Sequence, residues 1–278
     1  MKKIRISSIL LSAGIIALFV AAPALNAKTF AKNNNSIPTA PVLSVQEQLD
    51  KAKKDGKSVF LVITANKATG VDKAVTIAKG ATTKVAKSVV IQMNRDDAAN
   101  SNLVTKFGIA FVETPFILVI SPKGITVAGY PASSATSDML VQAIPSPKKE
   151  EVLLAISEKK PVFIVVSKKG LTDKATVLAN CKAVSAKMPN KPSVVEFDFN
   201  NTKDSEFLKQ IGVTSINDKT ITVVSNSSGQ VTDKYEGVAL EKALTASANK
   251  VVKTGGCCPG GSSKGCGPAT TPSGCGKK

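Results

Sequence analysis

Short, continuous apolar runs alternate along the chain with stretches whose apolar residues recur at helical spacing. A continuous apolar run is typical of a strand that is covered on both faces of a sheet. The order of the runs occurs twice, so the pattern predicts two related domains in tandem. The predicted strands span 59–64, 88–93, 116–120 and 125–128 in the first copy, and 162–166, 194–199 and a hairpin over 220–232 in the second.

Capping signals place helices between these strands. Ser44 and Glu47 form a capping box, and Ser146 followed by Pro147 marks the start of a helix in the second copy. The predicted helices span 44–55, 102–107, 137–144, 150–157, a segment that contains Cys181, 205–211 and 240–250. The order of elements predicts an α/β fold in each copy, with a mixed central sheet and helices on both faces.

Changes in composition divide the rest of the chain. We predict a signal peptide at 1–27, a polar linker at 28–43, a first domain at 44–147, a second domain at 148–252 and a flexible Gly/Cys-rich tail at 253–278. The tail is rich in Gly, Ser, Pro and Thr, so it cannot build a core of its own.

The N-terminus has the pattern of a secretory signal. Lys2, Lys3 and Arg5 precede an apolar run at 9–25, and Ala27 ends a small-residue cleavage motif. An uncleaved membrane anchor is the alternative, but the run is at the short end for a span. We therefore expect a periplasmic or secreted protein with no membrane span after cleavage, in a compartment where disulfides persist.

The chain is strongly basic, with a formal net charge of +17. Nearly all of this charge is Lys, because Arg95 is the only arginine after the signal segment, and aromatic residues make up only 4% of the chain. Scattered Lys without Arg clusters or stacking aromatics argues against specific nucleic-acid binding. A solvated surface with weak attraction to an anionic envelope polymer fits better. The absence of His excludes His-based catalysis and ligation.

The phrases FLVITA and KFGIAFVETPFILVISPKG in the first copy resemble a thioredoxin-fold domain, over about 45–147. The second copy is similar to the same family more loosely, over about 150–252, and has Lys219-Thr220 where the family places a proline. The resemblance implies two tandem thioredoxin-like domains and a cis-proline at Pro115. A cis-proline there would leave the preceding backbone free to pair with an extended peptide. A purely structural turn is the alternative, which the lack of neighbouring thiols favours.

The redox centre of that family is absent from both copies. The family carries Cys-x-x-Cys at the start of the helix after the first central strand, where the helix N-terminus acidifies the thiol. The corresponding positions are about Ala68 and Val71 in the first copy, and Gly170 and Asp173 in the second. Neither domain can therefore exchange dithiols at this position, and we predict no catalytic residue in either. Degenerate domains of this family serve as binding modules and spacers, so the resemblance implies a protein or peptide partner.

The five cysteines fall into two groups. Cys181 lies among apolar residues at helical spacing, which predicts a buried, inert thiol. The other four lie in the tail: Cys257, Cys258, Cys266 and Cys275. Their spacing does not suit a structural zinc site. We expect disulfides within the tail or between chains first, a soft metal such as Cu(I) second, and catalytic redox chemistry third.

Together these features predict a non-catalytic binding or scaffolding protein of the cell envelope or exterior, whose tail forms disulfides and which requires no cofactor. The alternative is a protein that handles thiol–disulfide exchange or a soft metal through its tail.

Overall fold

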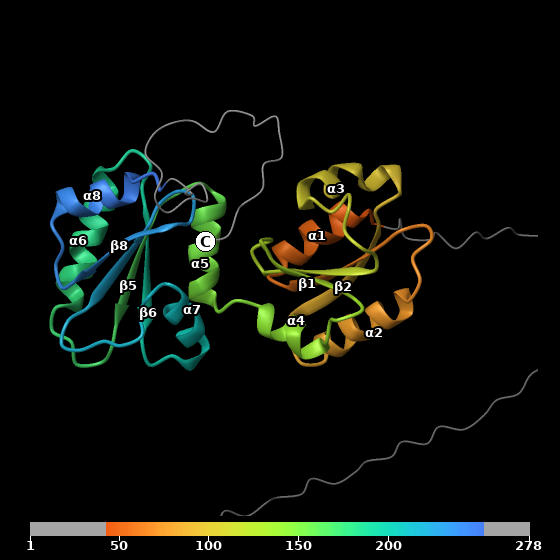
Figure 1. Cartoon of the computed structure of the whole chain (residues 1–278), viewed down its shortest axis with the longest axis horizontal. Helices are drawn as coiled ribbons and strands as arrows, with labels where there is room; N and C mark the ends of the chain where they lie inside the picture. Colours follow the sequence, from red (N-terminus) through yellow and green to blue (C-terminus); the bar gives the residue numbers. More distant parts are fainter. Residues whose placement is uncertain (1–42, 253–278) are drawn as a thin grey trace, which may run out of the picture. The chain divides into compact units, whose positions relative to one another are not determined.

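The computed structural model describes residues 43–252 and contains two repeats of the same element order (Figure 1). Repeat 1 consists of α1 (Val45–Lys54), β1 (Ser58–Thr64), α2 (Val71–Thr82), β2 (Ser88–Asn94), α3 (Ser101–Phe107), β3 (Phe116–Ile120), β4 (Thr126–Pro131) and α4 (Ser137–Ala143). Repeat 2 consists of α5 (Pro147–Ser157), β5 (Val162–Ser167), α6 (Lys174–Lys187), β6 (Ser193–Asp198), α7 (Ser205–Gln210), β7 (Ile221–Ser225), β8 (Val231–Glu236) and α8 (Glu241–Asn249).

Each repeat has its own four-stranded sheet. The strand order is β2-β1-β3-β4 in repeat 1 and β6-β5-β7-β8 in repeat 2. In both sheets the first two strands along the chain are parallel, and the third strand runs antiparallel to the first and pairs with the fourth as a hairpin. The tandem α/β fold predicted from the sequence is thereby confirmed.

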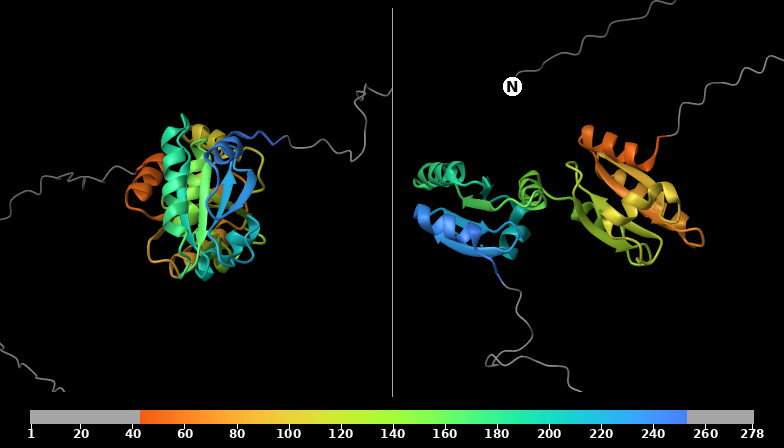
Figure 2. Two further views of the ribbon diagram at one scale, coloured as in Figure 1. Left: turned by 90° about the vertical axis from the view of Figure 1, so that its left-hand side faces the viewer. Right: turned by 90° about the horizontal axis from the view of Figure 1, so that it is seen from above.

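Helices cover both faces of each sheet, as the two further views show (Figure 2). In repeat 1, Leu49 of α1 and Leu103 of α3 pack on one face of the sheet, while Ala74 of α2 and Leu140 of α4 pack on the other. This double cover explains the continuous apolar strands, because neither face of a central strand meets water. Leu61, at the centre of β1, has no exposed surface.

Repeat 2 is packed in the same way. Val152 of α5 and Leu208 of α7 belong to one core cluster, and Val177 of α6 and Leu244 of α8 belong to the other. Between residues 43 and 252, no helix is long and apolar enough to cross a membrane. The predicted signal peptide, most of the linker and the cysteine tail lie outside the described residues.

Candidate functional site

A pocket of about 240 Å³ lies in repeat 1 where α2 begins and β3 begins. It is lined by Thr69, Gly70, Lys73, Glu113, Thr114, Pro115, Pro131, Ala132 and Ser133. Gly70 caps α2 in a left-handed conformation with φ 76° and supplies no side-chain cap. A residue without a side chain suits this position, because left-handed backbone is costly for other residues. The pocket therefore opens beside an uncapped helix N-terminus.

The backbone next to the pocket is unpaired. The peptide bond between Thr114 and Pro115 is cis, and Pro115 has no N–H to donate. The carbonyl of Pro115 accepts a hydrogen bond from Ala132 N at 2.9 Å, which joins it to the residue directly after β4. By contrast, the backbone groups of Glu113 and Thr114 form no hydrogen bond with any described residue. Two consecutive residues thus present main-chain donors and acceptors at the mouth of the pocket.

An aromatic side chain stands just before this segment. Phe111 is 100% exposed, which is the highest value among the large hydrophobic residues of the described chain. Single exposed apolar residues are common on protein surfaces. What distinguishes Phe111 is its place two residues before the unpaired backbone of Glu113 and Thr114.

The loops around the pocket are tied together by Arg95 and Asp96, which follow β2. The guanidinium Nη1 of Arg95 donates to the carbonyl of Val112, in the segment that leads to Pro115. The carboxylate of Asp96 accepts from Asn66 N at 2.8 Å, in the loop that leads to α2. Arg95 and Asp96 also form an ion pair at 3.7 Å. The loop before α2 and the segment before β3, which form two sides of the pocket, are therefore both bonded to the turn that contains Arg95 and Asp96.

Sequence reasoning missed the part played by Arg95 and Asp96. Both lie in the polar segment 94–97 directly after a predicted strand. Asn and Asp are common in turns, so the sequence alone predicts an ordinary turn there. The sequence feature that could have indicated the role of Arg95 is that it is an arginine rather than a lysine. In a chain whose positive charge is nearly all Lys, one Arg offers a forked guanidinium that can bind a carboxylate and a carbonyl together.

Repeat 2 differs from repeat 1 at the equivalent place. The third strand begins opposite the penultimate residue of the first strand in both repeats, so Thr220 stands where Pro115 stands. Asp173 caps α6 as Gly70 caps α2. The Asp173 carboxylate accepts hydrogen bonds from Thr220 N at 3.0 Å and from Thr220 Oγ1 at 2.7 Å. Thr220 is fully buried, so its donors are satisfied inside the protein.

The positions predicted to be degenerate redox sites lie at the starts of these two helices. Ala68 is in the loop before α2, and Val71 is the first residue of that helix. Gly170 is in the loop before α6 with φ 96°, and Asp173 caps α6. The structure brings Asp173 to Thr220, whereas Ala68 and Val71 do not line the pocket.

Cys181 lies inside repeat 2. It is 1% exposed in α6 and belongs to the apolar cluster of Phe163, Val177 and Leu244. Its Sγ lies 3.9 Å from Thr222 Oγ1. Burial raises the pKa of the Cys181 thiol, because the charged thiolate is disfavoured away from water. The thiol is thus neutral and shielded.

The tail cysteines Cys257, Cys258, Cys266 and Cys275 lie outside the described residues. Within 43–252, no three His, Cys, Asp or Glu side chains lie together in a way that could hold a metal ion. The described residues give the geometry of the pocket and of Cys181. The predictions about the tail cysteines remain predictions.

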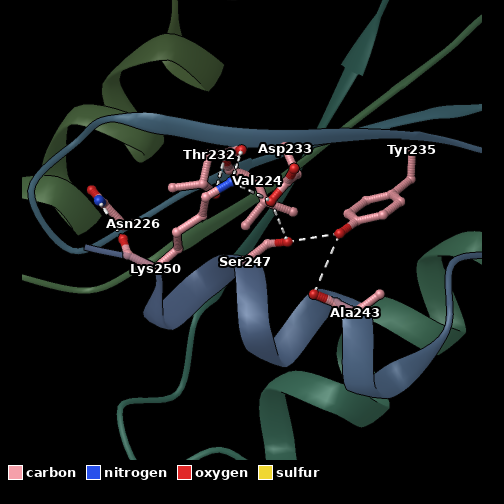
Figure 3. A network of polar contacts seen from close by, with 8 residues as sticks. All are labelled: Val224, Asn226, Thr232, Asp233, Tyr235, Ala243, Ser247 and Lys250. Atoms are coloured by element: carbon pink, nitrogen blue, oxygen red, sulfur yellow. Dashed lines mark hydrogen bonds and ion pairs between the residues drawn. The ribbon is translucent and has the colours of Figure 1, made fainter. Parts of the chain in front are cut away.

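A polar network fastens the last described helix to the sheet of repeat 2 (Figure 3). Ser247 Oγ donates to Asp233 Oδ2 at 2.8 Å and lies 2.7 Å from the Tyr235 hydroxyl. Asn226 Nδ2 donates to the Lys250 carbonyl at 2.9 Å. Asn226 directly follows β7, whereas Thr220 directly precedes it. The segment that leads into the tail is therefore held at the end of β7 opposite the Asp173–Thr220 contact.

The strand order, the parallel first pair, the terminal hairpin and the helices on both faces define each repeat as a thioredoxin-like domain. No protein-family model and no curated protein matches the chain.

Several solved structures are similar in fold. The first two thioredoxin domains of Naumovozyma dairenensis Eps1p share 11% identity over 78% of this chain and 99% of that one, with a TM-score of 0.29. Zinc-bound human ERp44 shares 10% identity over 74% of this chain and 58% of that one, with a TM-score of 0.32. The DsbH oxidoreductase shares 15% identity over 41% of this chain and 90% of that one, with a TM-score of 0.27.

Proposed function

We propose that the chain is a non-catalytic binding protein of the cell envelope or exterior, in which repeat 1 binds an extended peptide segment of a partner. The observation that carries this proposal is the unpaired backbone of Glu113 and Thr114 beside the pocket. An extended peptide pairs with such a segment through main-chain hydrogen bonds, and adjacent pockets select its side chains.

The pocket suits one side chain of that peptide. Its walls include Gly70 and Ala132, which leave room, while Thr69, Lys73 and Ser133 supply polar atoms. Exposed Phe111 offers an apolar contact to a residue further along the same peptide. Arg95 and Asp96 hold the surrounding loops in place, so little ordering remains to be done on binding.

Binding at this site is non-covalent in our proposal. Disulfide exchange requires an accessible thiolate. The two positions that would carry the redox cysteines in repeat 1 are Ala68 and Val71, which have no thiol. Cys181 is buried in the other repeat. The signal segment at 1–27 supports export, and the four tail cysteines support anchoring by disulfides in an oxidising compartment.

The binding site can be tested by changing one backbone donor. Peptides selected from a random decapeptide library on the mature chain would be fluorescently labelled and titrated by anisotropy. Thr114→Pro removes the free N–H of Thr114, whereas Thr114→Val keeps both the N–H and the branched shape. We expect Thr114→Pro to weaken binding by about fivefold, because a hydrogen bond contributes about 1 kcal/mol.

A second pair of variants tests the pocket. Ser133→Trp fills the pocket, and Ser134→Trp places the same side chain on the next exposed residue, outside the pocket lining. The proposal requires weaker or altered binding for the first and unchanged binding for the second. Equal affinity of Thr114→Pro and the unmodified chain, with both folded by circular dichroism, would show that the peptide binds elsewhere. Loss of binding when a copper chelator is added would favour metal handling by the tail instead.

A further inference from the structure

The outer edge of β2 presents unpaired backbone groups. Ser58 N donates to the Lys87 carbonyl, and Arg95 N donates to the Thr64 carbonyl, so the odd-numbered residues of β2 bond to β1. In a parallel ladder the backbone groups of successive residues point to opposite sides. The even-numbered residues of β2 therefore direct their N–H and C=O groups outward. No described strand pairs with this edge, because β2 is the last strand of its sheet. At its end, the Asn94 carbonyl accepts a hydrogen bond from Asn100 Nδ2 at 2.8 Å, whereas the backbone groups of Val90 and Gln92 have no partner among the described residues.

Only one of the two equivalent edges carries charges. β2 reads SVVIQMN, with no charged residue, whereas its counterpart β6 reads SVVEFD. Glu196 and Asp198 of β6 stand where β2 has Gln92 and Asn94. Charged side chains on an edge strand hinder pairing with another strand, and a neutral apolar edge favours it. The edge of repeat 2 is thus protected in a way that the edge of repeat 1 is not.

A groove accompanies the β2 edge on the side of α1. Its volume is about 280 Å³. It is lined by Leu43, Gln48, Lys51, Ala52, Asp55, Lys57, Val89 and Ile91. Val89 and Ile91 are odd-numbered residues of β2 whose side chains face α1. A strand added to the edge would direct every second side chain over this groove, because side chains alternate between the two faces of a sheet.

We propose that two copies of this chain associate through their β2 strands, which pair in antiparallel orientation. The sheet of repeat 1 in one copy then continues into the sheet of repeat 1 in the other copy. A two-fold axis at Ile91 pairs Val90 with Gln92 of the partner subunit, and Ser88 with Asn94 of the partner subunit. These four residues are the ones whose backbone groups point outward. The pairing therefore gives partners to the outward backbone groups of Ser88, Val90 and Gln92 and to the N–H of Asn94, whose carbonyl already accepts from Asn100 Nδ2.

The side chains are self-complementary in this register. On the α1 face, Ile91 lies opposite Ile91 of the partner subunit and Val89 lies opposite Met93 of the partner subunit, so every pair on this face is apolar. On the other face, every pair is uncharged. At the ends, Lys87 lies opposite Arg95 of the partner subunit, whose charge is offset by Asp96 at 3.7 Å. Opposed cross-strand pairs of this apolar kind stabilise a sheet.

The experiment is sedimentation of the full mature chain over about a hundredfold range of concentration, with reductant and chelator present so that the tail cannot link the copies. We expect a monomer–dimer equilibrium. Gln92→Pro removes one outward N–H per copy and leaves the β1–β2 bonds intact. It should raise the dimer Kd by at least about tenfold, because two hydrogen bonds are lost from each dimer.

Glu196→Pro makes the same change at the equivalent edge of repeat 2 and should leave the dimer Kd unchanged. Hydrogen exchange gives a second readout, since the amides of Val90 and Gln92 should become protected as the dimer forms. A chain that stays monomeric at every concentration overturns the proposal, whether the edge stays open or residues 28–42 cover it. A dimer that Gln92→Pro leaves intact also overturns it.

Discussion

Repeat 1 and repeat 2 share strand order, register and layers, yet they differ where the third strand begins. In repeat 1, Pro115 follows a backbone segment that forms no hydrogen bond and borders an open pocket. In repeat 2, the carboxylate of Asp173 accepts two hydrogen bonds from Thr220, which is fully buried. The same fold thus presents an open site in one copy and an internal contact in the other.

The two repeats differ in the same direction at their edge strands. Repeat 2 has Glu196 and Asp198 where repeat 1 has Gln92 and Asn94. Lys174 pairs with Glu196, so the charged edge is also tied to α6. The first difference leaves an open pocket in repeat 1 and a buried polar contact in repeat 2, and the second leaves repeat 1 with the uncharged edge strand. The apolar pattern maintains the fold in both copies, and a few polar residues make the two copies differ at the start of the third strand and at the edge strand.

The largest effect should come from opening the closed copy. Asp173→Ala removes the acceptor of two Thr220 donors that have no access to water. A buried unsatisfied donor costs about 1–3 kcal/mol, so the unfolding free energy of repeat 2 should fall by about that amount. Chemical denaturation followed by circular dichroism measures it. Asp173→Asn keeps a side-chain oxygen and should recover part of the loss; equal stability of all three chains would mean that the contact adds nothing.

A smaller effect is expected when the loops of repeat 1 are loosened. Arg95→Gln removes the guanidinium that donates to the Val112 carbonyl and pairs with Asp96. We expect a loss of about 1–2 kcal/mol in stability, since this ion pair is partly exposed. Peptide affinity should also fall, whereas a merely structural role would leave the affinity of the folded protein unchanged. Arg95→Lys keeps the charge without the planar fork and should recover little of the affinity.

The smallest effect concerns Cys181 and alkaline pH. Burial raises the pKa of this thiol above its ordinary value of 9.0, so the folded state holds the proton more tightly than the unfolded state. Its contribution to stability is complete below pH 9.0 and decreases as pH rises through the folded pKa. Cys181→Ala should remove this alkaline decrease in the unfolding free energy. An identical pH profile for the variant would mean that the thiol does not titrate differently on unfolding.

The fold could be predicted because its main signal is local. The apolar run predicted at 59–64 is β1, which the structure assigns to Ser58–Thr64. The strand predicted at 125–128 was too short, since β4 continues to Pro131. Gly129 and Pro131 look like strand breakers in sequence. On this edge strand they are tolerated, because Gly129 makes room for Phe116, whose Cε1 would lie 2.6 Å from an added Cβ.

The site was harder to predict because its contacts are distant in sequence. Asp173 and Thr220 are 47 residues apart, and nothing in either local pattern shows that a carboxylate would meet a hydroxyl. The unpaired state of Glu113 and Thr114 is likewise a property of the folded loops. The resemblance to thioredoxin-fold domains directed attention to Pro115, and the residues that hold its surroundings, Arg95 and Asp96, became visible only in three dimensions.

The most direct test of the account compares two backbone amides of the mature chain by nuclear magnetic resonance while a selected peptide is added. Thr114 directly precedes Pro115 in repeat 1, and Thr220 stands at the position of Pro115 in repeat 2. The account predicts that the Thr114 amide shifts and becomes protected from exchange, while the Thr220 amide stays as it was. Peptide-dependent shifts at Thr220, with none at Thr114, would contradict it.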